Sequence, residues 1–158
     1  MLAYVFWHRP RPGADRDEYE DALARFHSSL DNPSASFRLD ALPFGDGEPG
    51  YEDWYLVDDW AALGELNVAA VDAAHRPRHD AAAELAAHGW GGVYALLRGP
   101  AEPPATARWR HRAPDEPELA VWQRQMVLGP APEYCVSEPR GEAPRPTGRV
   151  PIRDSRSS

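Results

Sequence analysis

The feature that most constrains this chain is the alternation of strand-like and helix-like segments through its first 98 residues. Residues 2–9 are apolar and aromatic on both alternating sets of side chains, which is typical of a central strand covered on both faces. Strands are also expected at 35–42, 51–57 and 91–98, and turn-forming residues are dense between the second and the third strand. With two helices between them, the order of elements is β-α-β-β-α-β.

The helices are predicted from caps and from apolar spacing. Asp15 can cap the first helix, because a carboxylate accepts hydrogen bonds from the free amides of a helix N-terminus. An apolar stripe at helical spacing follows, formed by Tyr19, Ala22, Leu23, Phe26 and Leu30. The second helix is expected to start near Trp60 and to reach about Ala87 in two pieces, because Pro77 lacks an amide donor and clashes with the preceding turn.

The remainder of the chain has a different pattern. Three further strands are predicted at 106–112, 119–128 and 133–137, with no room for a long helix between them. The last twenty residues are rich in Pro, Gly, Arg and Ser and have few apolar anchors, which predicts a mobile tail. We therefore expect a β-α-β-β-α-β unit at 1–99, additional strands packed on the same domain at 105–138, and a flexible tail at 139–158.

Composition excludes several classes of function. The 158 residues suit one domain, and a net charge of -8 disfavours nucleic acid or an anionic membrane surface as a partner. All seventeen basic residues are arginine, which excludes Schiff-base catalysis by lysine and a P-loop lysine. Cys135 is the only cysteine, so no intrachain disulfide can form and a reducing cytoplasm is expected. The apolar run at the N-terminus has no basic region before it and is too short for a signal peptide or a membrane helix.

Histidines are the candidates for acid/base chemistry, since imidazole titrates near neutrality. The four candidates are His8, His27, His75 and His79. His75 and His79 also have the spacing of a metal pair on one helix face, but Pro77 between them spoils that geometry and no third ligand is near. We expect no metal site there, and a capping or solvent-facing role is the alternative for both histidines.

Aromatic residues are numerous in the first hundred positions, and their ordinary interpretation is core. The functional interpretation is a pocket for a planar ligand, oriented by Tyr hydroxyl and Trp indole groups. Candidate ligand-binding residues are Tyr4, Phe6, Phe26, Trp54, Trp90, Tyr94 and Arg124. The row Arg108, Arg110 and Arg112 is either a solvated strand face or a partner for a carboxylate-bearing ligand. Arg124 lies among bulky apolar neighbours and needs a partner, which Glu133 or Glu18 could provide.

The element order and the aromatic first strand resemble the ferredoxin-like domains of the dimeric α/β-barrel superfamily. The segments ALGELNVAAVDAAHRPRHDAAAELA and GGVYALLRG are also similar to uncharacterised small proteins of high-GC bacteria. The resemblance covers residues 1–99 and implies an α+β fold, a homodimer in which two sheets face each other, and a pocket between sheet and helices. Members include cofactor-independent oxygenases, cyclases, isomerases, haem-degrading enzymes and ligand-binding regulators, so the fold alone names no reaction. The three additional strands depart from the family pattern.

These observations predict a small cytoplasmic protein that acts on or binds a small hydrophobic metabolite, with aromatic and carboxylated molecules among the options. The chemistry would be cofactor-independent proton transfer, of an oxygenase, cyclase or isomerase type. We expect the pocket to be lined by Tyr4, Phe6, His8, Phe26 and Tyr94, with His8 at its mouth. A non-catalytic ligand-binding or assembly domain is the alternative, and haem binding through His75, His79 or His27 is a third option.

Overall fold

The computed structural model describes residues 1–112, 114, 120–128, 131–137 and 148–153. Within them the chain has an α+β fold. Its elements are β1 (Leu2–Pro10), α1 (Arg16–His27), β2 (Ser34–Leu39), β3 (Gly50–Val57), α2 (Trp60–Ala69), α3 (Arg76–Ala83), β4 (Ala86–Arg98), β5 (Arg108–Arg110), β6 (Ala120–Leu128), β7 (Tyr134–Ser137) and β8 (Arg149–Ile152). None of the helices in this described part has the length and apolarity that crossing a lipid bilayer would require.

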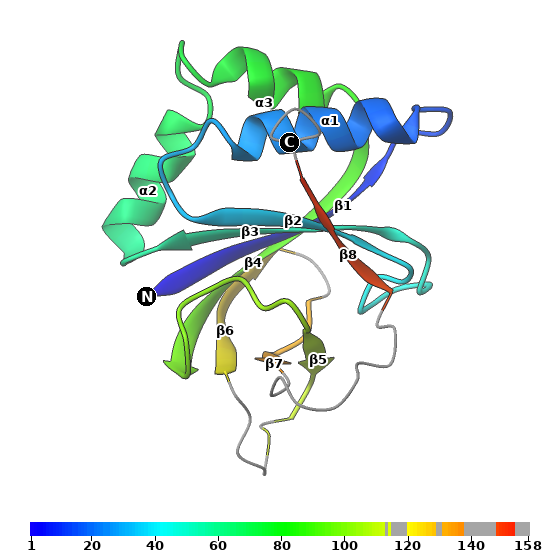
Figure 1. Ribbon diagram of the computed structural model, residues 1–158. Coiled ribbons are helices and arrows are strands. Elements are labelled where there is room, and N and C mark those ends of the chain that lie inside the picture. The colour runs from blue at the N-terminus through cyan, green and yellow to red at the C-terminus, as the bar shows by residue number, and fades with distance from the viewer. Residues whose placement is uncertain (113, 115–119, 129–130, 138–147, 154–158) are drawn as a thin grey trace.

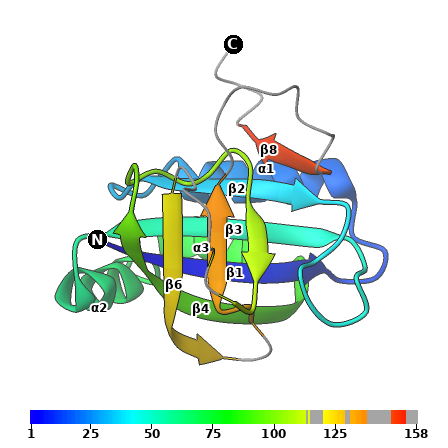
Figure 2. The same cartoon turned by 90° about the horizontal axis from the view of Figure 1, so that it is seen from below.

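The strands of the described residues form one antiparallel sheet in the order β5-β7-β6-β4-β1-β3-β2-β8. The helices cover one face of its central strands, while β5, β6 and β7 curl beneath the other face (Figure 1). Seen from below, these three strands cross in front of β1 and β3 (Figure 2). The sheet is therefore curled, and its central strands are covered on both sides.

Local sequence signals explain where the helices begin. The carboxylate of Asp15 accepts a hydrogen bond from the Glu18 amide at 2.9 Å, and that of Asp59 accepts one from the Ala62 amide at the same distance. The second helix is in two pieces, as predicted, and Pro77 lies in the first turn of α3, where its missing amide has no intrahelical partner to lose.

Strand β1 sends alternate side chains to the two faces. Ala3, Val5 and Trp7 enter the core on the face covered by β5 to β7. Tyr4 and Phe6 point toward the helices. The prediction of a central strand covered on both faces is confirmed.

The core opposite the helices contains a fully buried carboxylate, Glu52. It accepts hydrogen bonds from the indole N–H groups of Trp7, Trp54 and Trp109 at 2.9, 2.6 and 2.8 Å. The guanidinium of Arg149, on β8, also donates to it. Four donors therefore compensate one buried charge, as burial of a carboxylate requires.

Strand β8 differs from the sequence-based expectation, which assigned these residues to a mobile tail. It pairs with β2, with Leu39 opposite Arg149. The sequence around Arg149 has few apolar anchors, and the buried contact with Glu52 supplies the missing attachment. The other residues of the predicted tail, 139–147 and 154–158, lie outside the described residues.

One further expectation needs correction. Strand β4 begins at Ala86 rather than Gly91, because its residues continue to pair with β1 where a helix end was predicted. On β6, Trp122 is fully buried in the core, whereas Met126 is 47% exposed and lies on the helix side of the sheet. Alternation alone would place both side chains on one face, and the register shift between Val93 and Tyr94 in the pairing with β4 moves Met126 to the other.

We predict that Arg149→Ala destabilises the domain by about 3–5 kcal/mol, because it removes one partner of a buried ion pair. The matched control is Arg153→Ala, which removes the same side chain from an exposed position of the same segment and should change stability by less than about 0.5 kcal/mol. Urea unfolding of both variants measures the difference. Equal effects would contradict the assignment of Arg149 as the anchor of β8.

Candidate functional site

A cavity of about 720 Å³ lies between the helices and the sheet. Its walls are mainly aromatic and aliphatic, with contributions from β1, β3, β4 and all three helices. The aromatic members are Tyr4, Phe6, Tyr19, Phe26, Tyr55 and Trp60. Its size and its lining are those of sites that bind small organic molecules.

Small side chains of the helices leave part of the cavity unfilled, although Leu23, Phe26 and Leu66 of the same helices also line it. Gly64 and Ala70 of the α2 region line it, as do Ala82 and Ala83 of α3. These residues cannot fill the space above the large rings of β1. Close packing is the rule in protein interiors, so a space of this size reflects the choice of residues around it.

Glycines of β4 decide how the β1 rings lie. Gly91 is paired with Phe6, and Gly89 with His8. A Cβ atom at Gly89 would lie 2.2 Å from the Phe6 ring, and one at Gly91 would lie 2.7 Å from the Tyr4 hydroxyl. The two rings can therefore lean across β4 only because these positions have no side chain.

The polar end of the cavity is centred on His8, which is only 2% exposed. Its Nδ1 lies 2.5 Å from the hydroxyl of Tyr19, and its Nε2 lies 3.0 Å from Oδ2 of Asp53. The ring is stacked between Tyr51 and Phe6, with centroid distances of 5.6 and 5.4 Å. Its position is therefore fixed by contacts on both nitrogens and both faces.

Asp53 is shared by two imidazoles. Its Oδ2 also lies 3.4 Å from Nε2 of His27 and accepts a hydrogen bond from the Tyr55 hydroxyl at 3.2 Å. The His27 ring is stacked on Tyr55, with the centroids 4.9 Å apart. Elements β1, α1 and β3 thus bring together His8, His27 and Asp53 around one carboxylate oxygen.

Burial and charge set the ionisation of this cluster. Burial alone would raise the pKa of Asp53, but the neighbouring imidazoles of His8 and His27 outweigh it and hold that pKa below its ordinary value. Burial, with the nearby charge of Asp53, raises the pKa of Tyr19 and that of Tyr55. Asp53 is therefore the ionised member, and the two tyrosines keep their protons.

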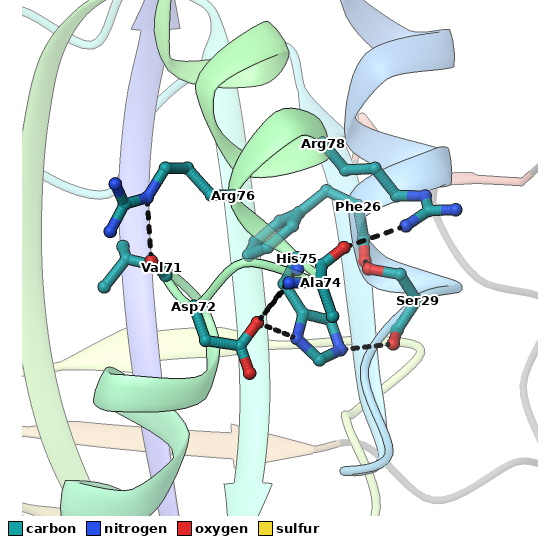
Figure 3. Close-up of polar contacts among 8 residues, drawn as sticks. All are labelled: Phe26, Ser29, Val71, Asp72, Ala74, His75, Arg76 and Arg78. Carbon is teal, nitrogen blue, oxygen red and sulfur yellow. Dashed lines mark hydrogen bonds and ion pairs between the residues drawn. The ribbon is translucent and has the colours of Figure 1, made fainter.

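The other two candidate histidines have different surroundings. His79 lines the cavity, and its Nδ1 lies 3.0 Å from Asp80. His75 lies at the start of α3 with both ring nitrogens engaged, by the Asp72 carboxylate at 2.9 Å and the Ser29 carbonyl at 3.0 Å (Figure 3). The side-chain contact with Asp72 raises the pKa of His75. His75 thus fastens the α2–α3 connection to the end of α1.

Several residues predicted to bind ligand lie elsewhere. Trp54, Trp90 and Tyr94 belong to or pack on the core of the opposite face, because alternation along β3 and β4 turns them away from the helices. The Tyr94 hydroxyl donates to the Pro132 carbonyl at 2.7 Å. Arg124 donates to the Ala131 carbonyl and does not line the cavity. The expectation that these four residues lie beside the cavity is therefore wrong. Tyr4, Phe6, His8 and Phe26 do line it.

Residue patterns did not identify Asp53, Tyr19 and Tyr55 as site residues. The sequence nevertheless contained a signal for Asp53. Tyr51, Asp53 and Tyr55 occupy alternate positions and share one side of a strand, and the residues on its other side are apolar apart from Glu52. A carboxylate within such a strand must be buried and must have partners. That reasoning identifies Asp53 as a site candidate, although it does not identify its partners.

Among the residues that the structure describes, no group of three or more His, Cys, Asp or Glu side chains is arranged to hold a metal ion. Cys135 is buried, and burial raises the pKa of its thiol well above the ordinary value, which keeps it from acting as a nucleophile. No family model, curated protein or solved structure matches this chain. Functional inference therefore depends on the geometry of the cavity.

We predict that Gly89→Ala lowers the free energy of unfolding by about 1–3 kcal/mol, because the added methyl group must displace the Phe6 ring. Gly64→Ala is the matched control: a Cβ there meets nothing within 4 Å, and alanine favours helix, so stability should rise by about 0.5–1 kcal/mol. Thermal and urea unfolding report both changes. A neutral Gly89→Ala variant would show that the Phe6 ring is not held against β4.

A second prediction concerns the stability of the protein at acidic pH. The pKa of Asp53 is below its ordinary value in the folded state, so this group contributes stability above about pH 4, and the contribution is lost as the pH falls below that value. The stability difference between the wild type and Asp53→Asn should therefore shrink on acidification. Urea unfolding at a series of acidic pH values measures it. A difference that stays constant over this range would contradict the ionised assignment.

Proposed function

We propose that this protein binds a small hydrophobic molecule in the cavity between helices and sheet and transfers a proton to or from it. The observation that carries the proposal is the array of Asp53, His8 and Tyr19 at the polar end of a mainly apolar cavity. Such an array has the parts of general acid–base catalysis: a base, a group that orients it, and a hydroxyl.

The direction of proton flow follows from Asp53. Its negative charge favours a proton on the nearest nitrogen, Nε2 of His8, which leaves Nδ1 to accept from the Tyr19 hydroxyl. A substrate proton then moves to His8, either through the Tyr19 hydroxyl or after the substrate replaces that hydroxyl. Asp53 stabilises the imidazolium that forms.

This chemistry needs no cofactor for its proton steps. In an isomerisation or a cyclisation, a proton removed from one atom of the substrate returns to another, and no electrons are gained or lost overall. An oxygenase would require dioxygen as a second substrate in addition to this base. We therefore place the isomerase and cyclase types ahead of the oxygenase type.

The finer fold assignment belongs to the same proposal. The element order and the central strand order β4-β1-β3-β2 support a ferredoxin-like unit of the dimeric α/β-barrel type. The homodimer remains a prediction. The sheet face that would meet a second subunit is covered by β5, β6 and β7 of the same chain, so we expect any dimer to use another surface. A cytoplasmic location also remains a prediction, supported by the single cysteine.

Two alternatives are ranked lower. A non-catalytic ligand-binding domain is favoured by one observation, the contact of the two His8 nitrogens with Tyr19 and Asp53, which a purely structural cluster would also show. Haem binding has less support, because His75 is engaged at both nitrogens and Nε2 of His27 faces Asp53 and Tyr55. Of the three haem-ligand candidates, His79 alone lines the cavity.

The test uses a panel of apolar cyclic ketones in D₂O, with deuterium incorporation beside the carbonyl followed by NMR. We expect the wild type to catalyse exchange and His8→Gln to lower the rate by about 10²–10⁴-fold. Tyr19→Phe, which removes only the hydroxyl, should also lower it. His111→Gln is the control, since His111 is exposed and does not line the cavity, so the rate should stay unchanged.

Exchange by His8→Gln at the wild-type rate would refute the role of His8. Saturable binding of the ketones by the wild type with no exchange would instead favour the non-catalytic alternative. Circular dichroism of each variant separates loss of the base from loss of the fold.

A further inference from the structure

We infer that the cavity selects apolar planar molecules that carry a hydroxyl or amine donor and no negative charge. This inference rests on the proposed function, because it concerns the ligand of the same site. It replaces the broader expectation that the ligand could also be a carboxylate.

The charge of the cavity wall disfavours an anionic ligand. Among the described residues that line the cavity none is an arginine, and the chain contains no lysine. The expectation of a carboxylated ligand depended on the row Arg108, Arg110 and Arg112, which does not line the cavity, and Arg124 is bound to a backbone carbonyl. Asp53 is the one carboxylate among the described lining residues, and it is buried. An anionic ligand would lose its hydration without gaining a guanidinium partner, and it would meet a negative charge.

The hydrogen bonding of the two Asp53 oxygens favours a ligand that carries a donor. Oδ2 is contacted by His8, His27 and Tyr55. Oδ1 is buried and has no hydrogen-bond partner among the described residues. A buried acceptor without a donor is unfavourable, so a ligand that donates an O–H or N–H to this oxygen gains more than one that cannot.

The shape of the aromatic wall favours a planar ligand. The rings of Tyr4 and Phe6 are inclined by 26°, and those of Tyr4 and Tyr55 by 25°, with centroids 6.2 and 6.0 Å apart. Three neighbouring rings therefore present nearly parallel faces across β1 and β3. The absence of side chains at Gly89 and Gly91 gives two of these rings the room to lie this way. A flat ring system matches such a wall better than a branched aliphatic chain.

The experiment compares three naphthalene probes of one ring system: 2-naphthol, 2-methoxynaphthalene and 2-naphthoate. The methoxy group removes the donor while keeping the oxygen, and the carboxylate adds the negative charge. Affinities are measured by calorimetry with the full-length protein, at a single pH near neutrality at which 2-naphthol is neutral and 2-naphthoate is an anion. We expect 2-naphthol to bind about tenfold or more tightly than 2-methoxynaphthalene, and 2-naphthoate to bind most weakly.

Asp53→Asn removes the negative charge and should narrow the affinity difference between 2-naphthol and 2-naphthoate. It also replaces a charged acceptor by a weaker neutral one, so the difference between 2-naphthol and 2-methoxynaphthalene should become smaller too. Asp46→Asn makes the same chemical change at an exposed turn outside the cavity and should leave the order unchanged. If Asp53→Asn does not fold, the order of affinities in the wild type decides alone.

The outcomes separate the two proposals. Binding of 2-naphthoate as tight as that of 2-naphthol, or equal affinity for 2-naphthol and its methyl ether, would overturn the selectivity while leaving the cavity as a binding site. Failure of all three probes to bind the wild type would overturn the proposed function together with this inference.

Discussion

The structure depends on how two adjacent carboxylates in the middle of strand β3 are compensated. Glu52 and Asp53 are both buried, and because neighbouring residues of a strand point in opposite directions, they enter different sides of the sheet. Neither could remain there as an isolated charge. Glu52 is satisfied by three indoles and by Arg149, and one oxygen of Asp53, Oδ2, is contacted by two imidazoles and a tyrosine. Two of the partners belong to β3 itself and the others come from β1, β5, β8 and α1, so each carboxylate ties distant parts of the chain to the central strand.

The two sides of the sheet have different consequences for function. On the Glu52 side, tryptophan rings from β1, β3, β5 and β6 contact one another, and those of Trp7, Trp54 and Trp122 are fully buried. On the Asp53 side, small as well as large side chains of the helices face the sheet, and a cavity remains. A rigid, filled face beneath a cavity is a suitable support for a reactive group, because the strand that carries Asp53 cannot shift without disturbing the buried pair of Glu52. The candidate site is thus held in position by the core on the opposite face of the sheet, which contributes no residue to the site.

Much of this arrangement could be predicted from residue patterns, and the failures have physical causes. Alternation along residues 2–9 correctly placed Tyr4, Phe6 and His8 on one face, and helical spacing placed Phe26 toward the sheet. Tyr94 was placed on the wrong face, since alternation within a strand does not state which of its two sides meets the helices. The attachment of β8 was missed because its anchor is one arginine whose partner lies 97 residues away. The assembly around Asp53 was missed for a related reason: its members come from three elements, and no local spacing relates them.

By itself, the sequence determined the succession of helices and strands as far as β7, the helix caps, and the exclusion of lysine and disulfide chemistry, because these follow from the period of apolar residues and from residue identity. It also identified His8 and His27 as candidates for proton transfer. The tertiary structure alone decided that both imidazoles share Asp53, that Tyr19 meets His8, and that none of the described arginines lines the cavity. The physical reason is that a strand register and a helix docking position are set by packing over the whole domain, while the charges and hydrogen bonds of a site depend on distances of a few ångströms between residues remote in the chain.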